Sequence, residues 1–142
     1  MQQDFAVLDA DMFYSPDDSG IITGMLESIC RMSAVFNQQG TAILWTMAGG
    51  LDCLKNTYHR QFFSEIKCLV LTCEPDELRR RMTEGRGITD ESWLNGSREY
   101  NAYFCTHDVL GDVRFDTLDI TRLSPAEVAE QVLVWMNTQL HT

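Results

Sequence analysis

The sequence predicts a three-layer α/β domain in which a mostly parallel sheet of about four strands is covered by helices on both faces. Short apolar runs alternate with longer helical segments along all 142 residues, without repeats, linkers or low-complexity segments. Short strands joined by long helices require crossover connections, which bring successive strands parallel and cover both faces of the sheet. A chain of this length suits one domain, so we expect residues 1–142 to form a single domain.

The first half of the chain is predicted to contain two strands and two helices. Phe5–Leu8 and Thr41–Met47 are short apolar runs typical of buried strands. Turn-forming residues occupy 15–20, and apolar residues then recur at helical spacing from Ile21 to about Gln38. The segment from Leu51 to about Phe63 is the second predicted helix.

The second half is predicted to add two strands and three helices. Ile66–Cys73 is the strongest strand pattern, because nearly every residue in it is apolar or favours strands. Pro75 opens a helix with acidic residues at its positive end, and a polar, aromatic-rich helix runs from Asp90 to about Phe104. Arg114–Ile120 is the last predicted strand, and Ser124 begins the final helix with a capping box. The buried stripe of that helix is expected at Val128, Val132, Trp135 and Met136.

Composition and charge exclude several classes of partner. The chain has 21 acidic and 11 basic residues and a net charge of −10, which repels nucleic acids and anionic membranes. No apolar run approaches the length of a membrane span. Five cysteines without a CxxC pair suit free thiols in a reducing compartment. We therefore expect a cytoplasmic protein with a small-molecule substrate, no nucleic acid and no membrane; homo-oligomerisation is left open.

Polar side chains gather where the predicted strands end, which is where open α/β sheets bind ligands. These residues are Asp9, Asp11, Thr46, Glu74, Asp119 and Thr121. Asp9 and Asp11 face the same way in an extended chain because alternate residues do so. Two such carboxylates can hold Mg²⁺ or accept a proton from an attacking hydroxyl. The alternative is a solvent-facing acidic turn.

Arginines are concentrated after Pro75, where Arg79, Arg80 and Arg81 are followed by Arg86. Several guanidinium groups near a strand end suit a transferring phosphoryl group. The alternative is a solvated helix face that pairs with Glu77 and Glu84. Gly85 and Gly87 flank Arg86, which predicts a hinge for the segment that follows.

Taken in order, these motifs resemble the small P-loop kinases, meaning nucleoside and nucleotide kinases and their shikimate and gluconate kinase relatives. Residues 69–82, followed by Arg86 and a helical excursion, are similar to the strand, helix and lid of that family. Val7–Asp11 is similar to the acidic strand end that meets the phosphoryl acceptor. Asp116–Thr121 is similar to the last strand and the loop bordering adenine, and Ser124–Leu140 matches the closing helix.

The resemblance implies a phosphotransferase that uses ATP and Mg²⁺ and transfers to a small hydroxyl or phosphate acceptor. It implies that residues 86–105 form a lid-like excursion. The implied catalytic residues are Asp9, Asp11, Arg81 and Arg86, with Asp9 nearest the metal. The implied cofactor-binding residues are Asp119 and Thr121, and the implied substrate-binding residues are Trp93, Arg98 and Tyr100.

The sequence departs from this family at its most diagnostic element. It contains no Gly-x-x-x-x-Gly-Lys-Ser/Thr loop, so the backbone amides and the lysine that hold the β- and γ-phosphates are missing. The strand before that loop lies in the middle of the family's sheet, so its absence predicts two half-sheets with exposed edges. We expect a chain that is truncated, with its natural start upstream, or inactive as it stands.

Two other functions are alternatives. Asp9 with Asp11, Thr46, Lys55, and the pair Asp116 and Asp119 follow an order that resembles the haloacid-dehalogenase phosphatases. There, Asp9 would be the nucleophile and Asp11 the acid/base, but Phe13 stands where that family has threonine or valine. The second alternative is a non-catalytic, kinase-like scaffold that binds a protein or a small molecule.

Overall fold

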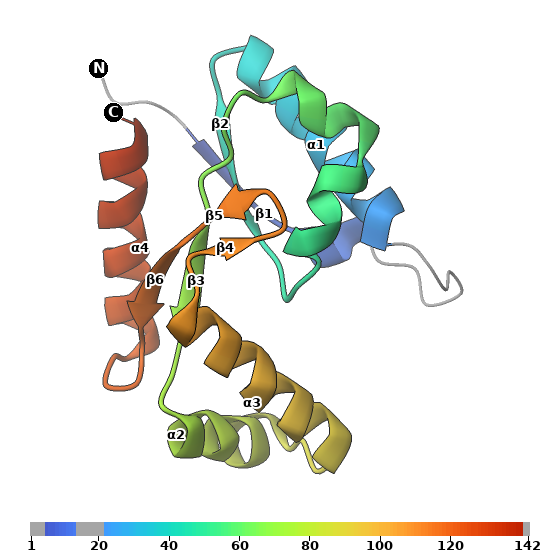
Figure 1. The fold of residues 1–142 in the computed structure, drawn as a ribbon. Helices are drawn as coiled ribbons and strands as arrows, with labels where there is room; N and C mark the ends of the chain where they lie inside the picture. The colour runs from blue at the N-terminus through green and yellow to red at the C-terminus, as the bar shows by residue number, and fades with distance from the viewer. Residues whose placement is uncertain (1–4, 14–21, 141–142) are drawn as a thin grey trace. The chain divides into compact units, whose positions relative to one another are not determined.

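The computed structural model describes residues 5–13 and 22–140 and shows a mixed α/β chain (Figure 1). The predicted turn at residues 15–20 lies outside the described residues. None of the helices described is long and apolar enough to cross a membrane.

The chain divides into two compact units, each with its own strands and helices. The first unit comprises residues 1–66 and 110–113, and the second unit comprises residues 67–109 and 114–142. The chain therefore leaves the first unit after residue 66 and returns to it for one short segment.

In the first unit, β1 (Phe5–Asp9) and β2 (Ala42–Thr46) form a two-stranded parallel sheet in which Asp9 is paired with Thr46. A 3-10 helix, η1 (Ala10–Phe13), follows β1, and α1 (Ile22–Gln38) leads to β2. The α1 helix packs against β2 through an apolar stripe. The buried members of this stripe are Leu26, Ile29 and Cys30. Helical spacing in the sequence predicted this element correctly.

The helix predicted at residues 51–63 is instead two 3-10 helices, η2 (Leu51–Asn56) and η3 (Tyr58–Phe62). Thr57 separates them in an extended conformation, with φ −85° and ψ 139°. Its hydroxyl donates a hydrogen bond to the carbonyl of Leu54, with an oxygen–oxygen distance of 2.7 Å. The backbone N–H of Thr57 donates to the same carbonyl at 3.1 Å, so both groups close the end of η2.

In the second unit, β3 (Leu69–Thr72) and β6 (Asp116–Asp119) form another two-stranded parallel sheet in which Thr72 is paired with Asp119. The strand predicted at residues 66–73 is shorter than expected, but its type is correct. A single sheet of about four strands is not present among the described residues. The prediction of one mostly parallel sheet of about four strands is therefore shown only in part, as small two-stranded sheets that are partly parallel.

Three helices and a π-helical turn complete the second unit. The α2 helix (Pro75–Arg80) runs into the π-helical turn η4 (Arg81–Gly85), and α3 (Glu91–Thr106) follows. The final helix, α4 (Pro125–Leu140), begins with the predicted capping box. The Ser124 hydroxyl accepts from the Glu127 N–H, and the Glu127 carboxylate accepts from the Ser124 N–H at 2.7 Å. In α4, Met136 is buried and the other three residues of the predicted stripe are half-buried.

A short hairpin was not predicted from the sequence. Its strands are β4 (Val109–Leu110) and β5 (Val113–Arg114), joined by Gly111 and Asp112. Gly111 has φ +64°, and a Cβ atom there would lie 3.1 Å from the Asp52 Cα and 3.2 Å from the Asp52 carbonyl oxygen. Both the backbone conformation and the close approach require glycine at this turn.

We predict that Gly111→Ala destabilises the chain more than Gly40→Ala. Gly40 also has a positive φ, +80°, but nothing lies within 4 Å of its added Cβ. Both variants carry the cost of left-handed backbone, about 1–2 kcal/mol, and only Gly111→Ala adds a steric clash of about 1–3 kcal/mol. Urea unfolding of the two variants measures the difference. Equal losses of stability would show that the Asp52 backbone does not approach the hairpin.

Candidate functional site

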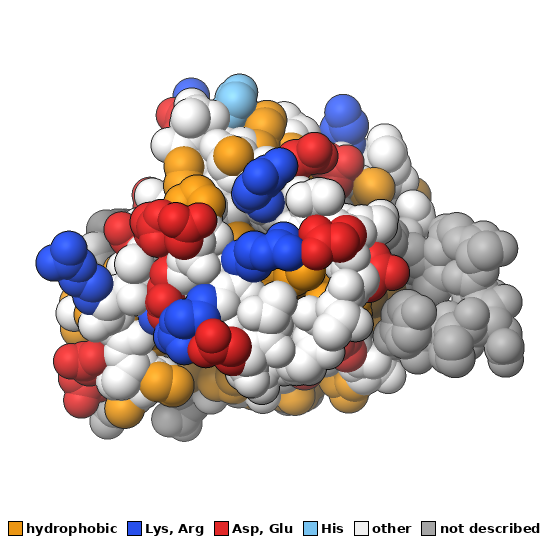
Figure 2. Space-filling model, turned by 90° about the horizontal axis from the view of Figure 1, so that it is seen from below, with side chains coloured by type: hydrophobic (Ala, Val, Ile, Leu, Met, Phe, Trp, Pro, Cys, Tyr) orange, Lys and Arg blue, Asp and Glu red, His pale blue; other side chains and the backbone are white. Residues whose placement is uncertain are grey.

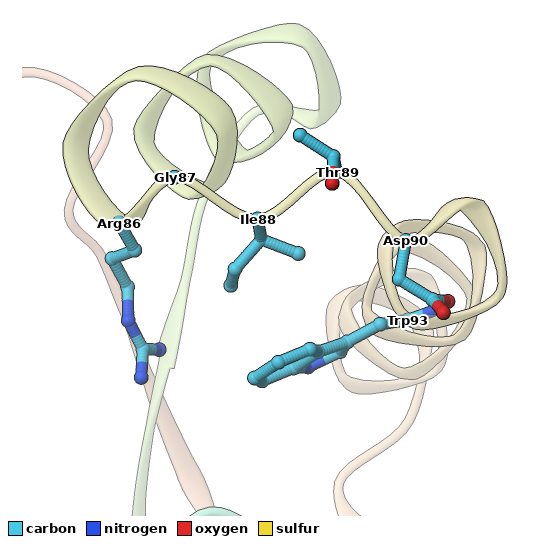
Figure 3. A pocket seen from close by; sticks show the side chains of 6 residues that line it. All are labelled: Arg86, Gly87, Ile88, Thr89, Asp90 and Trp93. Carbon is cyan, nitrogen blue, oxygen red and sulfur yellow. The ribbon is translucent and has the colours of Figure 1, made fainter.

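A shallow hollow of about 320 Å³ lies in the second unit between the end of η4 and the start of α3 (Figure 3). Its lining consists of Arg86, Gly87, Ile88, Thr89, Asp90 and Trp93. Figure 3 shows the Arg86 guanidinium and the Trp93 indole extending from two sides toward one space, with Ile88 between them. The hollow therefore combines one cation, one carboxylate, one hydroxyl, one aromatic face and one apolar side chain.

A small apolar cluster holds the turn that carries Arg86. Met82, Ile88 and Leu94 are each at least 90 % buried and pack together, with Leu78 against them. The turn is closed by the Ile88 N–H, which donates to the Met82 carbonyl at 3.0 Å. Gly87 has φ +66°, a left-handed conformation that lets the chain reverse after the π-helical turn. π-Helical turns often occur at functional sites.

Trp93 is positioned by the N-cap of α3. The Asp90 carboxylate accepts a hydrogen bond from the Trp93 N–H at 2.9 Å, so the first turn of the helix is fixed. The Trp93 side chain is nevertheless 54 % exposed. The indole N–H groups of Trp45 and Trp135 donate to Ser33 and Asp116, whereas that of Trp93 has no partner among residues 5–13 and 22–140. Its ring is available for a ligand.

Arg86 differs from the other arginines predicted to converge on a phosphoryl group. Arg79 pairs with Glu91 at 2.6 Å, and Arg80 pairs with Glu77 at 2.6 Å and with Glu84 at 3.2 Å. The Arg86 side chain is exposed and makes no ion pair with any described residue. Figure 2 shows basic and acidic side chains lying side by side on one face, without a continuous basic patch.

Arg81, predicted to be catalytic, connects α2 to the loop after β6. Its Nε donates to Glu77 at 2.8 Å, and one terminal nitrogen donates to the carbonyls of Ile120 at 3.1 Å and Thr121 at 2.8 Å. The guanidinium therefore links α2 to the loop that follows β6. The structure brings Arg81 together with Thr121 in a bracing arrangement that does not line the hollow.

Asp119 and Thr121 form a closed hydrogen-bonded group at the ends of β3 and β6. The Asp119 carboxylate accepts from the hydroxyl of Thr121 at 2.5 Å and from its N–H at 2.9 Å. The Thr121 hydroxyl oxygen in turn accepts from the N–H of Glu74 at 2.9 Å. The side-chain and backbone hydrogen bonds from Thr121 hold the pKa of Asp119 below its usual value.

Asn101 performs a structural role that the sequence did not indicate. Its side-chain amide accepts from the Cys73 N–H at 3.0 Å and donates to the Cys73 carbonyl at 2.8 Å. Both backbone groups at the end of β3 are thereby satisfied, and α3 is fixed to the strand. Arg98 and Tyr100, predicted to bind substrate, lie on the same helix but do not line the hollow. Tyr100 packs edge-on against Phe104, with ring centroids 4.5 Å apart.

Asp9 and Asp11 belong to the first unit. The Asp9 carboxylate accepts from the Asp11 N–H at 3.0 Å, and both residues are exposed. This is the geometry of an acidic turn, and one Asp9 oxygen is occupied by the backbone. No group of three or more metal-ligating side chains occurs in the described part of the chain.

We predict that Glu77 stabilises the second unit in a pH-dependent way. Hydrogen bonds from Arg80, and then from Arg81, lower the pKa of Glu77 from 4.5 to about 2. A carboxylate with a lowered pKa stabilises the fold above its unfolded pKa, and this stabilisation is lost as the pH falls from 4.5 toward 2. Glu77→Gln should therefore lower the unfolding midpoint at pH 7 and change it little at pH 2.

The matched control is Glu84→Gln, because Glu84 has one ion pair, at 3.2 Å, and its side chain is 68 % exposed. An exposed pair of this kind contributes little, so Glu84→Gln should change the midpoint little at either pH. Urea unfolding at the two pH values measures both effects. Identical behaviour of the two variants would contradict the special position of Glu77 between two arginines.

We compared the chain with known protein families, curated proteins and solved structures. No family model matches the chain, and no curated protein or solved structure matches it. Its fold and its hollow are therefore interpreted from its own residues.

Proposed function

We propose that this chain is a kinase-like phosphotransferase domain whose hollow between Arg86 and Trp93 contacts a ligand that carries both a phosphate and an aromatic ring. The observation that carries this proposal is the pairing of a guanidinium without an acidic partner with an exposed indole at one hollow. A nucleotide is the common biological ligand with those two chemical parts.

The chemistry of the two side chains fits such a ligand. Arginine presents several N–H donors in a planar fork that matches phosphate oxygens, and its charge is not neutralised here by a neighbouring carboxylate. An indole face stacks on a nucleobase, and stacking of this kind tolerates different bases. Ile88 supplies an apolar contact between them. The chain as a whole repels anions, and the positive charge of Arg86 offsets this repulsion locally.

The chain order and the pairing of the strands support the kinase-like part of the proposal. The hollow follows a strand, a proline-initiated helix and a glycine-flanked arginine, in the order that resembles the lid segment of small P-loop kinases. Four of the six described strands occur as parallel pairs, β1 with β2 and β3 with β6, as expected for that sheet without its central strand.

The remaining residues have narrower roles in this proposal. Arg86 contacts phosphate and Trp93 contacts the ring, while Arg81 fixes the loop that contains Thr121. Asp9 and Asp11, in the first unit, are exposed and offer carboxylate oxygens, which are the ligands that Mg²⁺ prefers. No lysine-bearing phosphate loop occurs in the sequence, so we expect weak binding of ATP, with a Kd of about 1 mM or weaker.

The three indole N–H signals in a ¹H–¹⁵N spectrum test the proposal, because each tryptophan reports separately. On titration with Mg–ATP, the Trp93 signal should move, whereas the hydrogen-bonded indoles of Trp45 and Trp135 serve as internal controls. Adenosine and ribose 5-phosphate each supply half of the ligand, so each should bind more weakly than ATP.

Arg86→Ala should weaken the binding of ATP at least about tenfold, because a charge-assisted hydrogen bond contributes about 1.5–3 kcal/mol. Arg114→Ala removes the same charge from a side chain that is 80 % exposed and pairs with Asp108, so it controls for bulk electrostatics. Equal losses in the two variants, or a Trp93 signal that does not move, would reject the hollow as a nucleotide site.

A further inference from the structure

Three aromatic rings form an exposed patch on η3 in the first unit. We call Tyr58, His59 and Phe62 the aromatic patch. Tyr58 is 66 % exposed and Phe62 is 59 % exposed. Their rings meet edge to face with centroids 5.8 Å apart, and the His59 ring lies 5.2 Å from Tyr58 and 5.6 Å from Phe62. Large apolar groups that gather on a surface in this way mark interaction sites.

One carboxylate from α1 holds the aromatic patch in place. Glu27 accepts hydrogen bonds from the backbone N–H of Tyr58 and, at 3.2 Å, from that of His59. It also contacts the His59 Nδ1 at 2.5 Å. The backbone and one ring are therefore ordered before any partner arrives, which lowers the entropy that binding must overcome.

The surroundings of the aromatic patch favour a cationic partner. Burial opposes ionisation of Glu27, but the hydrogen bonds from His59 and Tyr58 outweigh it and keep the pKa of Glu27 below its usual value. Arg60 of η3 contacts groups outside the patch. It donates to the Phe63 carbonyl at 2.8 Å, and its Nε lies 3.5 Å from the Asp112 carboxylate. None of its described polar contacts is with the patch.

We propose that the aromatic patch binds arginine or lysine side chains in a basic segment of a partner protein. The negative faces of aromatic rings attract cations, and arginine also stacks on them. Acidic residues outnumber the three basic residues of the first unit, Arg31, Lys55 and Arg60, which steers a basic segment toward it. The net charge of −10 disfavours a second copy of this chain and nucleic acids as occupants.

The test uses the full chain and a blocked Gly-Arg-Gly-Arg-Gly peptide, with Gly-Glu-Gly-Glu-Gly as the charge-reversed control. Titration of the ¹⁵N-labelled chain with the arginine peptide should shift the amide signals of residues 57–63. The double variant Y58L/F62L keeps the net charge and an apolar side chain at each position but removes both π faces. It should weaken binding at least about fivefold, the loss expected from two exposed cation–π contacts.

Two further variants keep the outcome interpretable. The exchange Y58F/F62Y preserves both rings and should retain binding. Val35→Ala removes a side chain on α1 that is 55 % exposed and should also retain it. Amide spectra of each variant verify that the fold is intact. Unchanged affinity in Y58L/F62L would show that bulk charge alone attracts the peptide, and the absence of any shift at residues 57–63 would also overturn the proposal.

Discussion

The parallel pairing of β3 with β6 is the interaction on which the candidate site depends. This pairing places the ends of two strands side by side, so that the N–H of Glu74 meets the Thr121 hydroxyl and Arg81 reaches the carbonyls of the same loop. A parallel sheet of two strands has little stability of its own. The side-chain braces from Arg81 and Asn101 therefore have a large share in holding the helices that carry the hollow.

The three arginines at residues 79–81 are each engaged by neighbouring groups. Arg79, Arg80 and Arg81 are neutralised by carboxylates or satisfied by carbonyls, whereas Arg86 is left without such a partner at the hollow. The aromatic patch presents a different chemistry, with exposed ring faces beside the Glu27 carboxylate. The two surfaces are thus suited to ligands of opposite charge, and they belong to different units of the chain.

Elements that depend on residues close together in the sequence could be predicted. Elements that depend on contacts between distant segments could not. Periodicity located α1, and Ser124 with Glu127 correctly marked the start of α4. The break at Thr57 could not be foreseen, because no glycine or proline marks it in the sequence. Arg86 and Trp93 were expected to share a lid segment. Which arginines are paired with carboxylates could not be predicted, because Arg79 pairs with Glu91 on a different helix.

The central claim is that the β3–β6 pairing and the side-chain hydrogen bonds of Asn101 and Arg81 open and close together. Residue-resolved hydrogen exchange tests this claim most directly. The Ile120 N–H belongs to the end of the β3–β6 pairing and donates to the Thr72 carbonyl at 2.8 Å, while the Cys73 N–H donates to the Asn101 side chain at 3.0 Å. We predict that both amides are protected and exchange through a common opening. Fast exchange of Cys73 beside a protected Ile120 would contradict this account, as would an unprotected β3–β6 pairing.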